Sequence, residues 1–253
     1  MKAAQIASVI EAFAPLSTQE SWDNAGFSVG SPWAEVHGVM VGFDCTPALV
    51  RAAAARGADM IVTHHPLIFG GLKRIDPDDP VGEAVMLAVR HGIVVYAAHT
   101  NADKAEGGVN TLMAGRLKLD NPQPIDDSGL ALIGSLPAPM DGEAFCRYVK
   151  QCFSLKVLRS SAPVSEVRCV ATSCGSGSSF AEQAFRAGAQ AFVTGDVSYH
   201  RFAVPEGRMI LDIGHWESEA EIVSKFVSLL QKNLPNFAVY TATPENNNPI
   251  YYY

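Results

Sequence analysis

No apolar run in this sequence of 253 residues reaches the roughly 18 residues that a membrane-spanning helix needs. The chain also opens without a secretory signal, and none of its five cysteines forms a C-x-x-C pair. We therefore expect a soluble cytoplasmic protein with free thiols in a reducing compartment. A zinc–thiolate site is not expected, because the paired spacing of such sites is missing.

Basic residues are few and scattered. The chain holds 19 Lys and Arg against 26 Asp and Glu, which gives a formal net charge of −7. Duplex DNA and anionic membranes are bound by clustered positive charge, and no such cluster appears in the sequence. We expect neither partner. A small anionic substrate remains compatible with this composition, because metal ions can hold it without a basic surface.

Apolar strand patterns alternate with helical patterns along most of the chain. Strands are expected at 37–44, 59–63, 93–98, 155–159, 166–173, 191–194 and 208–213. Helices are expected at 2–14, 48–56, 81–91, 107–117, from about 141, at 178–187 and at 215–232. This alternation predicts an α/β fold with mostly parallel sheets and helices on both faces.

A faint internal repeat divides the chain. Residues 55–63 resemble 186–194, and 92–99 resemble 207–215, which indicates either a duplication or coincidence among similar strands. Residues 120–129 are polar and contain proline, which predicts a linker. We therefore expect two similar lobes, 1–125 with the HHP and HTNAD motifs and 126–253 with the TGD and GHWESE motifs, or one intertwined unit.

Histidines and carboxylates follow three of the expected strands. In open parallel sheets, functional side chains lie just past the carboxyl ends of the strands. A helix that begins at His215 places Glu219 on the same face, four residues on. The candidate ligands of a two-metal site are His64, His65, Asp103, His215 and Glu219. Their nitrogen and oxygen donors fit Zn, Mn, Fe, Ni or Co. Hydrogen-bonded structural histidines and an ordinary helix-face contact are the alternative.

Other polar residues allow both a functional and a structural interpretation. His99 is expected to act as a proton carrier or as a partner of the ligands, and His200 as a second catalytic group or a structural residue. Lys73 is expected to bind a substrate anion or to be merely solvated. Gly175 and Ser176 belong to a glycine-rich turn that predicts either an anion cradle or a tight connection.

Several motifs resemble one known family, the GTP cyclohydrolase I type 2 homologues, also named after the Ngg-one-interacting factor three. The matching stretches are SWDNAGFSVG (21–30), VTHHPLIFGGLKRI (62–75), AAHTNADKAEGGVN (97–110), CGSGSS (174–179) and TGDVSYH…DIGHWESE (194–219). The resemblance implies metal ligation by the five candidates, two similar α/β lobes with the metal site in the cleft between them, and a ring-shaped homohexamer.

The resemblance also implies an activity. It points to a dinuclear protein with two divalent ions per chain that hydrolyses a nucleotide-like substrate, as the family name indicates for GTP. The alternative is a protein that carries or inserts metal, or a scaffold that binds a partner without turnover. One local departure from the family pattern is Trp216-Glu217 after Gly-His, which could alter the pocket without touching the ligands.

Overall fold

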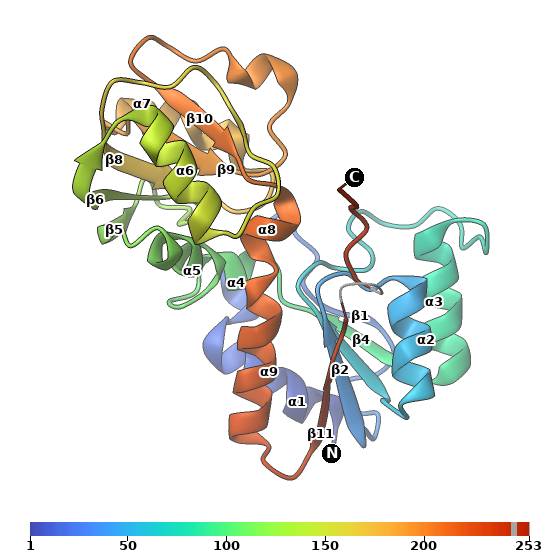
Figure 1. Cartoon of the computed structure of the whole chain (residues 1–253). Helices are drawn as coiled ribbons and strands as arrows, with labels where there is room; N and C mark the ends of the chain where they lie inside the picture. Colours follow the sequence, from blue (N-terminus) through green and yellow to red (C-terminus); the bar gives the residue numbers. More distant parts are fainter. Residues whose placement is uncertain (244–246, 253) are drawn as a thin grey trace. The chain divides into compact units, whose positions relative to one another are not determined.

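The computed structural model describes residues 1–243 and 247–252 (Figure 1). Contacts divide these residues into two compact units. Unit 1 contains residues 1–102 and 222–251, and unit 2 contains residues 103–221 and Tyr252. No helix within the described ranges is both long and apolar enough to cross a bilayer. The α/β class expected from the sequence is confirmed.

Unit 1 is built on a five-stranded sheet. Its order is β1-β4-β3-β2-β11, with β1 at Gly26–Val29, β2 at Gly38–Gly42, β3 at Met60–Thr63, β4 at Val94–Ala97 and β11 at Ala238–Thr241. Only β1 runs antiparallel to its neighbour. Strands β2, β3 and β4 are buried along their whole length, as is typical of a parallel sheet covered on both faces.

Helices cover the sheet of unit 1. These are α1 (Ala3–Phe13), α2 (Pro47–Ala55), α3 (Pro80–His91) and α9 (Glu221–Asn233), with the short η1 at Leu16–Thr18. Figure 1 shows α2 and α3 side by side on one face, where their apolar residues join those of β3 and β4 in one core. Lys225 of α9 lies 5.1 Å over the Phe13 ring of α1.

Local signals explain where the helices begin and end. The Thr46 side chain accepts a hydrogen bond from the Leu49 N–H at the start of α2, and Asp79 does the same for Gly82 in α3. Both helices also have proline in their first turn. Helix α3 ends at Gly92, whose φ of +66° is left-handed, a conformation that suits glycine.

Unit 2 is built on a six-stranded mixed sheet of order β5-β6-β8-β9-β10-β7. The strands are β5 (Asp120–Pro124), β6 (Leu132–Met140), β7 (Arg159–Ser160), β8 (Val167–Thr172), β9 (Ala191–Thr194) and β10 (Met209–Asp212). Its helices are α5 (Val109–Arg116), α6 (Gly142–Cys152), η2 (Gly177–Phe180), α7 (Ala181–Arg186), η3 (Tyr199–Phe202) and α8 (His215–Glu219).

The expectation of mostly parallel strands holds for unit 1 but not for unit 2. In unit 2 only β8, β9 and β10 run parallel to one another, and the other described pairings are antiparallel. The linker predicted at 120–129 is also wrong, because Asp120–Pro124 forms edge strand β5. A short connection joins β5 to β6, and such a connection permits only antiparallel pairing. An edge strand tolerates the prolines that suggested a linker.

The division of the chain differs from the expected boundary near residue 125. The chain leaves unit 1 in the short helix α4 (Thr100–Lys104) and returns in α9. Strand β11 then pairs with β2, so the C-terminal segment completes the first sheet. Unit 1 thus contains residues from both ends of the chain, and unit 2 is an insertion between them.

The two sheets share one topology over four strands. The order β1-β4-β3-β2 corresponds to β7-β10-β9-β8, with three parallel strands and one antiparallel edge strand in each unit. A five-residue helix follows the corresponding strands, α4 after β4 and α8 after β10. This correspondence favours a duplication over coincidence. It also places the candidate residues of each unit at the carboxyl edge of its parallel strands.

Candidate metal centre

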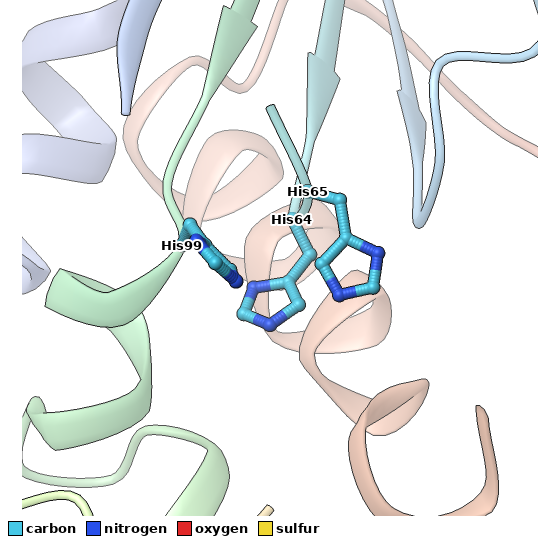
Figure 2. Close-up of side chains that lie close together, drawn as sticks. All are labelled: His64, His65 and His99. Atoms are coloured by element: carbon cyan, nitrogen blue, oxygen red, sulfur yellow. The ribbon is translucent and has the colours of Figure 1, made fainter. Parts of the chain in front are cut away.

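Three histidines lie together at the carboxyl edge of the unit 1 sheet (Figure 2). His64 and His65 follow β3, and His99 follows the neighbouring strand β4. The ring centroids of His64 and His65 are 5.0 Å apart, and each lies 5.4 Å from that of His99. One ring nitrogen of each histidine lies within 4.8 Å of the others, so the group could hold a metal ion.

The first two imidazoles are oriented through their Nδ1 atoms. His64 Nδ1 donates to the carbonyl oxygen of Ala98 across 2.9 Å, and His65 Nδ1 donates to the carboxylate of Asp44 across 2.8 Å. Histidines that bind metals usually donate their second ring N–H to a carbonyl or a carboxylate in this way. Nε2 is therefore the nitrogen of each ring that can bind a metal. The orientation of His64 and His65 is thus compatible with metal binding.

His99 is held by a buried carboxylate. Its Nδ1 donates to Asp23 Oδ1 across 2.8 Å, and Asp23 Oδ2 accepts hydrogen bonds from the N–H and hydroxyl of Thr100. Burial opposes ionisation of Asp23, but these hydrogen bonds outweigh it and lower its pKa to about 2. The ionised carboxylate accepts the hydrogen bond from Nδ1, which fixes the tautomer and the orientation of the His99 ring.

Unit 2 carries a second group of candidate ligands. His215 and Glu219 share one face of α8, with His215 Nε2 3.0 Å from Glu219 Oε2, as the four-residue spacing predicts. His215 Nδ1 donates to Asp196 across 2.7 Å, which again leaves Nε2 as the ligating atom. Glu219 and Asp103 are only 4% and 5% exposed, and both carboxylates lie beside the thiol of Cys174.

The Cys174 thiol lies in a buried site that carries negative charge. Burial raises the pKa of its thiol well above the usual value, and the neighbouring charges of Asp103 and Glu219 raise it further. The protonated thiol can therefore donate to the carboxylates. Two buried carboxylates carry a desolvation cost that a bound cation offsets. Their oxygens and the His215 nitrogen are donors that suit a divalent metal.

The glycine-rich turn after β8 lies against the second group, and the anion-binding role of Gly175 and Ser176 stays a prediction. Its first two N–H groups are used inside the protein, since Cys174 donates to Asn110 and Gly175 donates to Ser218. Gly175 has a φ of +53°, and an added Cβ would lie 2.3 Å from Glu219 Oε1. The turn thus brings the chain close to a candidate ligand, which a residue with a side chain could not do.

Ser176 and Glu217 form hydrogen bonds beside the candidate ligands. The Ser176 hydroxyl donates to Asp196, the carboxylate that orients His215. Glu217 accepts a hydrogen bond from the Tyr252 hydroxyl at 2.9 Å. The helical spacing predicted that Glu217 would not share the face of His215, and the contact with Tyr252 agrees with it.

Comparison with known proteins identifies the family. Residues 1–249 match the family described as Duf34/NIF3 (NGG1p interacting factor 3). The chain belongs to the Duf34/NIF3 family. It is 30% identical over 258 residues to the "GTP cyclohydrolase 1 type 2 homolog" of Clostridium perfringens, covering 98% of each chain.

Solved structures share this Duf34/NIF3 fold. The Staphylococcus aureus hypothetical protein SA1388 superposes with a TM-score of 0.87 at 28% identity, over 100% of this chain and 99% of that one. Reduced HcgD from Methanocaldococcus jannaschii gives a TM-score of 0.83 at 26% identity, over 95% and 97% of the two chains. The family resemblance stated from the motifs is therefore confirmed.

Two further predicted functional residues of this Duf34/NIF3 protein are His200 and Lys73. His200 belongs to η3 and lines a cavity of 540 Å³ together with Arg186, Arg201 and Arg208, and the walls of that cavity include none of the five candidate ligands. Lys73 is exposed in the segment between β3 and α3. The catalytic role of His200 and the substrate-binding role of Lys73 stay predictions.

Sequence reasoning did not identify the carboxylates that orient the histidines. These are Asp23, Asp44 and Asp196. The rule that functional side chains follow the carboxyl ends of parallel strands could have identified two of them, because Asp44 follows β2 and Asp196 follows β9. Cys174 was also missed, although it follows β8 in the same way. In this Duf34/NIF3 chain, the carboxyl edges therefore supply the partners as well as the ligands.

Proposed function

We propose that this protein binds about two divalent metal ions and uses them to hydrolyse a nucleotide-like substrate. The proposed ligands are His64, His65, Asp103, His215 and Glu219, treated as one set. The observation that carries the proposal is the shared orientation of the three histidine ligands, each held through Nδ1 by a carbonyl or a carboxylate. The two buried carboxylates beside Cys174 add the negative charge that a cation needs.

The names of relatives support the choice of substrate. Relatives of this chain carry the name "GTP cyclohydrolase 1 type 2 homolog", which connects them with a nucleotide. The mixture of nitrogen and oxygen donors is compatible with Zn, Mn, Fe, Ni or Co. Divalent ions in such a site would polarise the bond that is attacked and activate water.

The chain's own contribution to catalysis is proton transfer. Asp23 keeps the His99 proton on Nδ1, so Nε2 is the atom that would accept or donate a proton during the reaction. Three of the proposed ligands are nearly inaccessible, with His64 at 0%, Asp103 at 5% and Glu219 at 4% exposure. This burial excludes bulk water from the donors and strengthens the electrostatic interactions among them.

Metal analysis and an activity screen test the proposal together. The protein is purified without a metal-chelating tag, its metals are measured by elemental analysis, and GTP and a panel of phosphorylated nucleosides are screened for turnover. We expect bound divalent metal and hydrolysis of at least one compound of the panel. A metal-replete preparation without bound metal would contradict the proposal.

The same burial of the ligands favours a second candidate function. Inaccessible donors retain an ion tightly, which suits a protein that carries or inserts metal, or a scaffold that binds a partner without turnover. A fully loaded protein that turns over no compound in the panel would support this candidate and contradict the hydrolase.

We also propose, from the family resemblance, that the chain assembles into a homohexamer. Light scattering tests this directly. A mass much larger than the 27.0 kDa of one chain is expected, and a solution containing only single chains would contradict it.

A further inference from the structure

Two exposed aromatic rings lie beside His99 in unit 1. Trp22 and Phe69 are each 56% exposed, and their ring centroids are 6.0 Å apart. The centroid of His99 lies 6.4 Å from that of Trp22 and 6.0 Å from that of Phe69. His99 therefore belongs to two ring triangles, one with the exposed aromatic residues and one with His64 and His65.

The two segments that carry the rings are connected through the neighbours of Trp22 and Phe69 in the chain. Asn24, two residues after Trp22, donates through Nδ2 to the carbonyl oxygen of Ile68, one residue before Phe69, across 2.6 Å. Between Trp22 and Asn24, Asp23 is hydrogen-bonded to His99. One turn thus connects the tryptophan, the loop of the phenylalanine and the histidine. Segments connected in this way need less ordering when a ligand binds.

Ordinary packing does not explain this pair. Large aromatic rings gain most when they are buried, and neighbouring exposed apolar side chains commonly mark a binding surface. Trp33 is even more exposed, at 73%, but within the described ranges no ring contact is found for it. Trp22 and Phe69 differ because they lie next to each other and to the imidazole of His99.

We propose that Trp22 and Phe69 form a stacking site for a planar aromatic ring of the substrate. The inference rests on the proposed function and names the part of its substrate that this surface would bind, a planar heterocycle such as a nucleobase. The two rings are inclined at 55°, so a flat ligand can stack on only one of them and meets the other with its edge.

This geometry would also bring a bound ring close to His99. Both exposed rings are nearly perpendicular to the imidazole of His99, at 77° and 78°. A heterocycle that stacks on the face of either ring nearer to His99 would lie beside the imidazole. Stacking is tolerant of the identity of the base because every base has a π face, so the site selects for an aromatic ring and not for one particular base.

Binding of matched ligands tests the site. Dissociation constants are measured by calorimetry for AMP and GMP, which carry a base, and for ribose 5-phosphate, which lacks one. The variants are Trp22→Ala and Phe69→Ala, with Trp33→Ala as the control. We expect the first two to weaken AMP and GMP binding by roughly 5- to 100-fold, the range of one stacked base, and to leave ribose 5-phosphate unchanged.

Three further readouts separate stacking from other roles. Metal content and melting temperature are measured on the same samples, and Phe69→Tyr, which keeps a ring, should bind AMP as the wild type does. Equal AMP binding in the wild type and both alanine variants would overturn the inference. It would also be overturned if the alanine variants lost as much affinity for ribose 5-phosphate as for AMP. A wild type that binds AMP and GMP no better than ribose 5-phosphate would overturn it too.

The outcome also distinguishes this inference from the proposed function and from assembly. The wild type can hold no metal and show no turnover while AMP and GMP still bind to it more tightly than to both alanine variants. In that case the proposed function fails and the stacking site stands. If the alanine variants change the mass of the assembly but not the binding of AMP, the rings are a contact between copies of the chain, and the stacking site is overturned.

Discussion

Asp23 accepts a hydrogen bond from Nδ1 of His99 across 2.8 Å, although 76 positions separate the two residues. The second oxygen of the same carboxylate accepts from the N–H and the hydroxyl of Thr100, at the start of α4. One buried side chain therefore fixes the tautomer of His99 and the beginning of the helix that leads to Asp103. The turn at 21–24 is thereby part of the site and not only a connection.

Replacing Asp23 with Ala should lower the free energy of unfolding by about 3 kcal/mol, because buried donors lose their acceptor. Urea unfolding measures this, with exposed Asp78→Ala as the control. The folded-state pKa of about 2 lies below the ordinary 3.8, so the contribution is present at neutral pH and is lost as the pH falls through about 2. A change equal to that of Asp78→Ala would contradict the role of Asp23.

Glu219→Ala should lose bound metal, whereas Glu217→Ala should retain it. Glu219 is buried and its Oε2 lies 3.0 Å from His215 Nε2, while Glu217 accepts a hydrogen bond from Tyr252. Elemental analysis after dialysis compares the two variants. Equal metal loss in both would show that the face of α8 does not decide which glutamate binds.

Gly175→Ala should destabilise the protein and reduce its metal content. The new Cβ would lie 2.3 Å from Glu219 Oε1, and the backbone is left-handed at a φ of +53°. Gly207→Ala is the matched control, because Gly207 has a φ of +71° with no atom within 4 Å of an added Cβ. Melting temperature and metal analysis are the measurements. The control should lose about 1 kcal/mol of stability and no metal.

Much of the fold follows from short-range signals in the sequence. Caps at Thr46 and Asp79 mark helix starts, Gly92 marks a helix end, and apolar runs identify the buried strands. The metal candidates follow from the same strands, because parallel strands place their carboxyl ends at one edge. The prediction that all five cysteines are free thiols is also confirmed.

Features that depend on distant partners could not be predicted. Edge strands β1, β5 and β11 are short, and each forms because another strand offers hydrogen-bonding groups. The helix expected at 215–232 is divided at Ala220 into α8 and α9, although neither glycine nor proline stands there. The contact of Cys174 with two carboxylates depends equally on tertiary packing, since spacing along the chain carries no sign of it.

The last prediction separates metal binding from proton transfer within the histidine group. His65→Ala should lose metal and rate together, because His65 is a proposed ligand. His99→Ala should keep its metal and lose about 10² to 10⁴ in rate, the usual contribution of a general acid or base. His37→Ala is the control, since His37 has a similar Nδ1 contact with Asp59 at 2.9 Å but is an exposed surface residue outside the group. The control should change neither quantity. Metal content and turnover are measured on all three variants. If His99→Ala loses as much metal as His65→Ala, then His99 is a ligand and the ligand set extends beyond five residues.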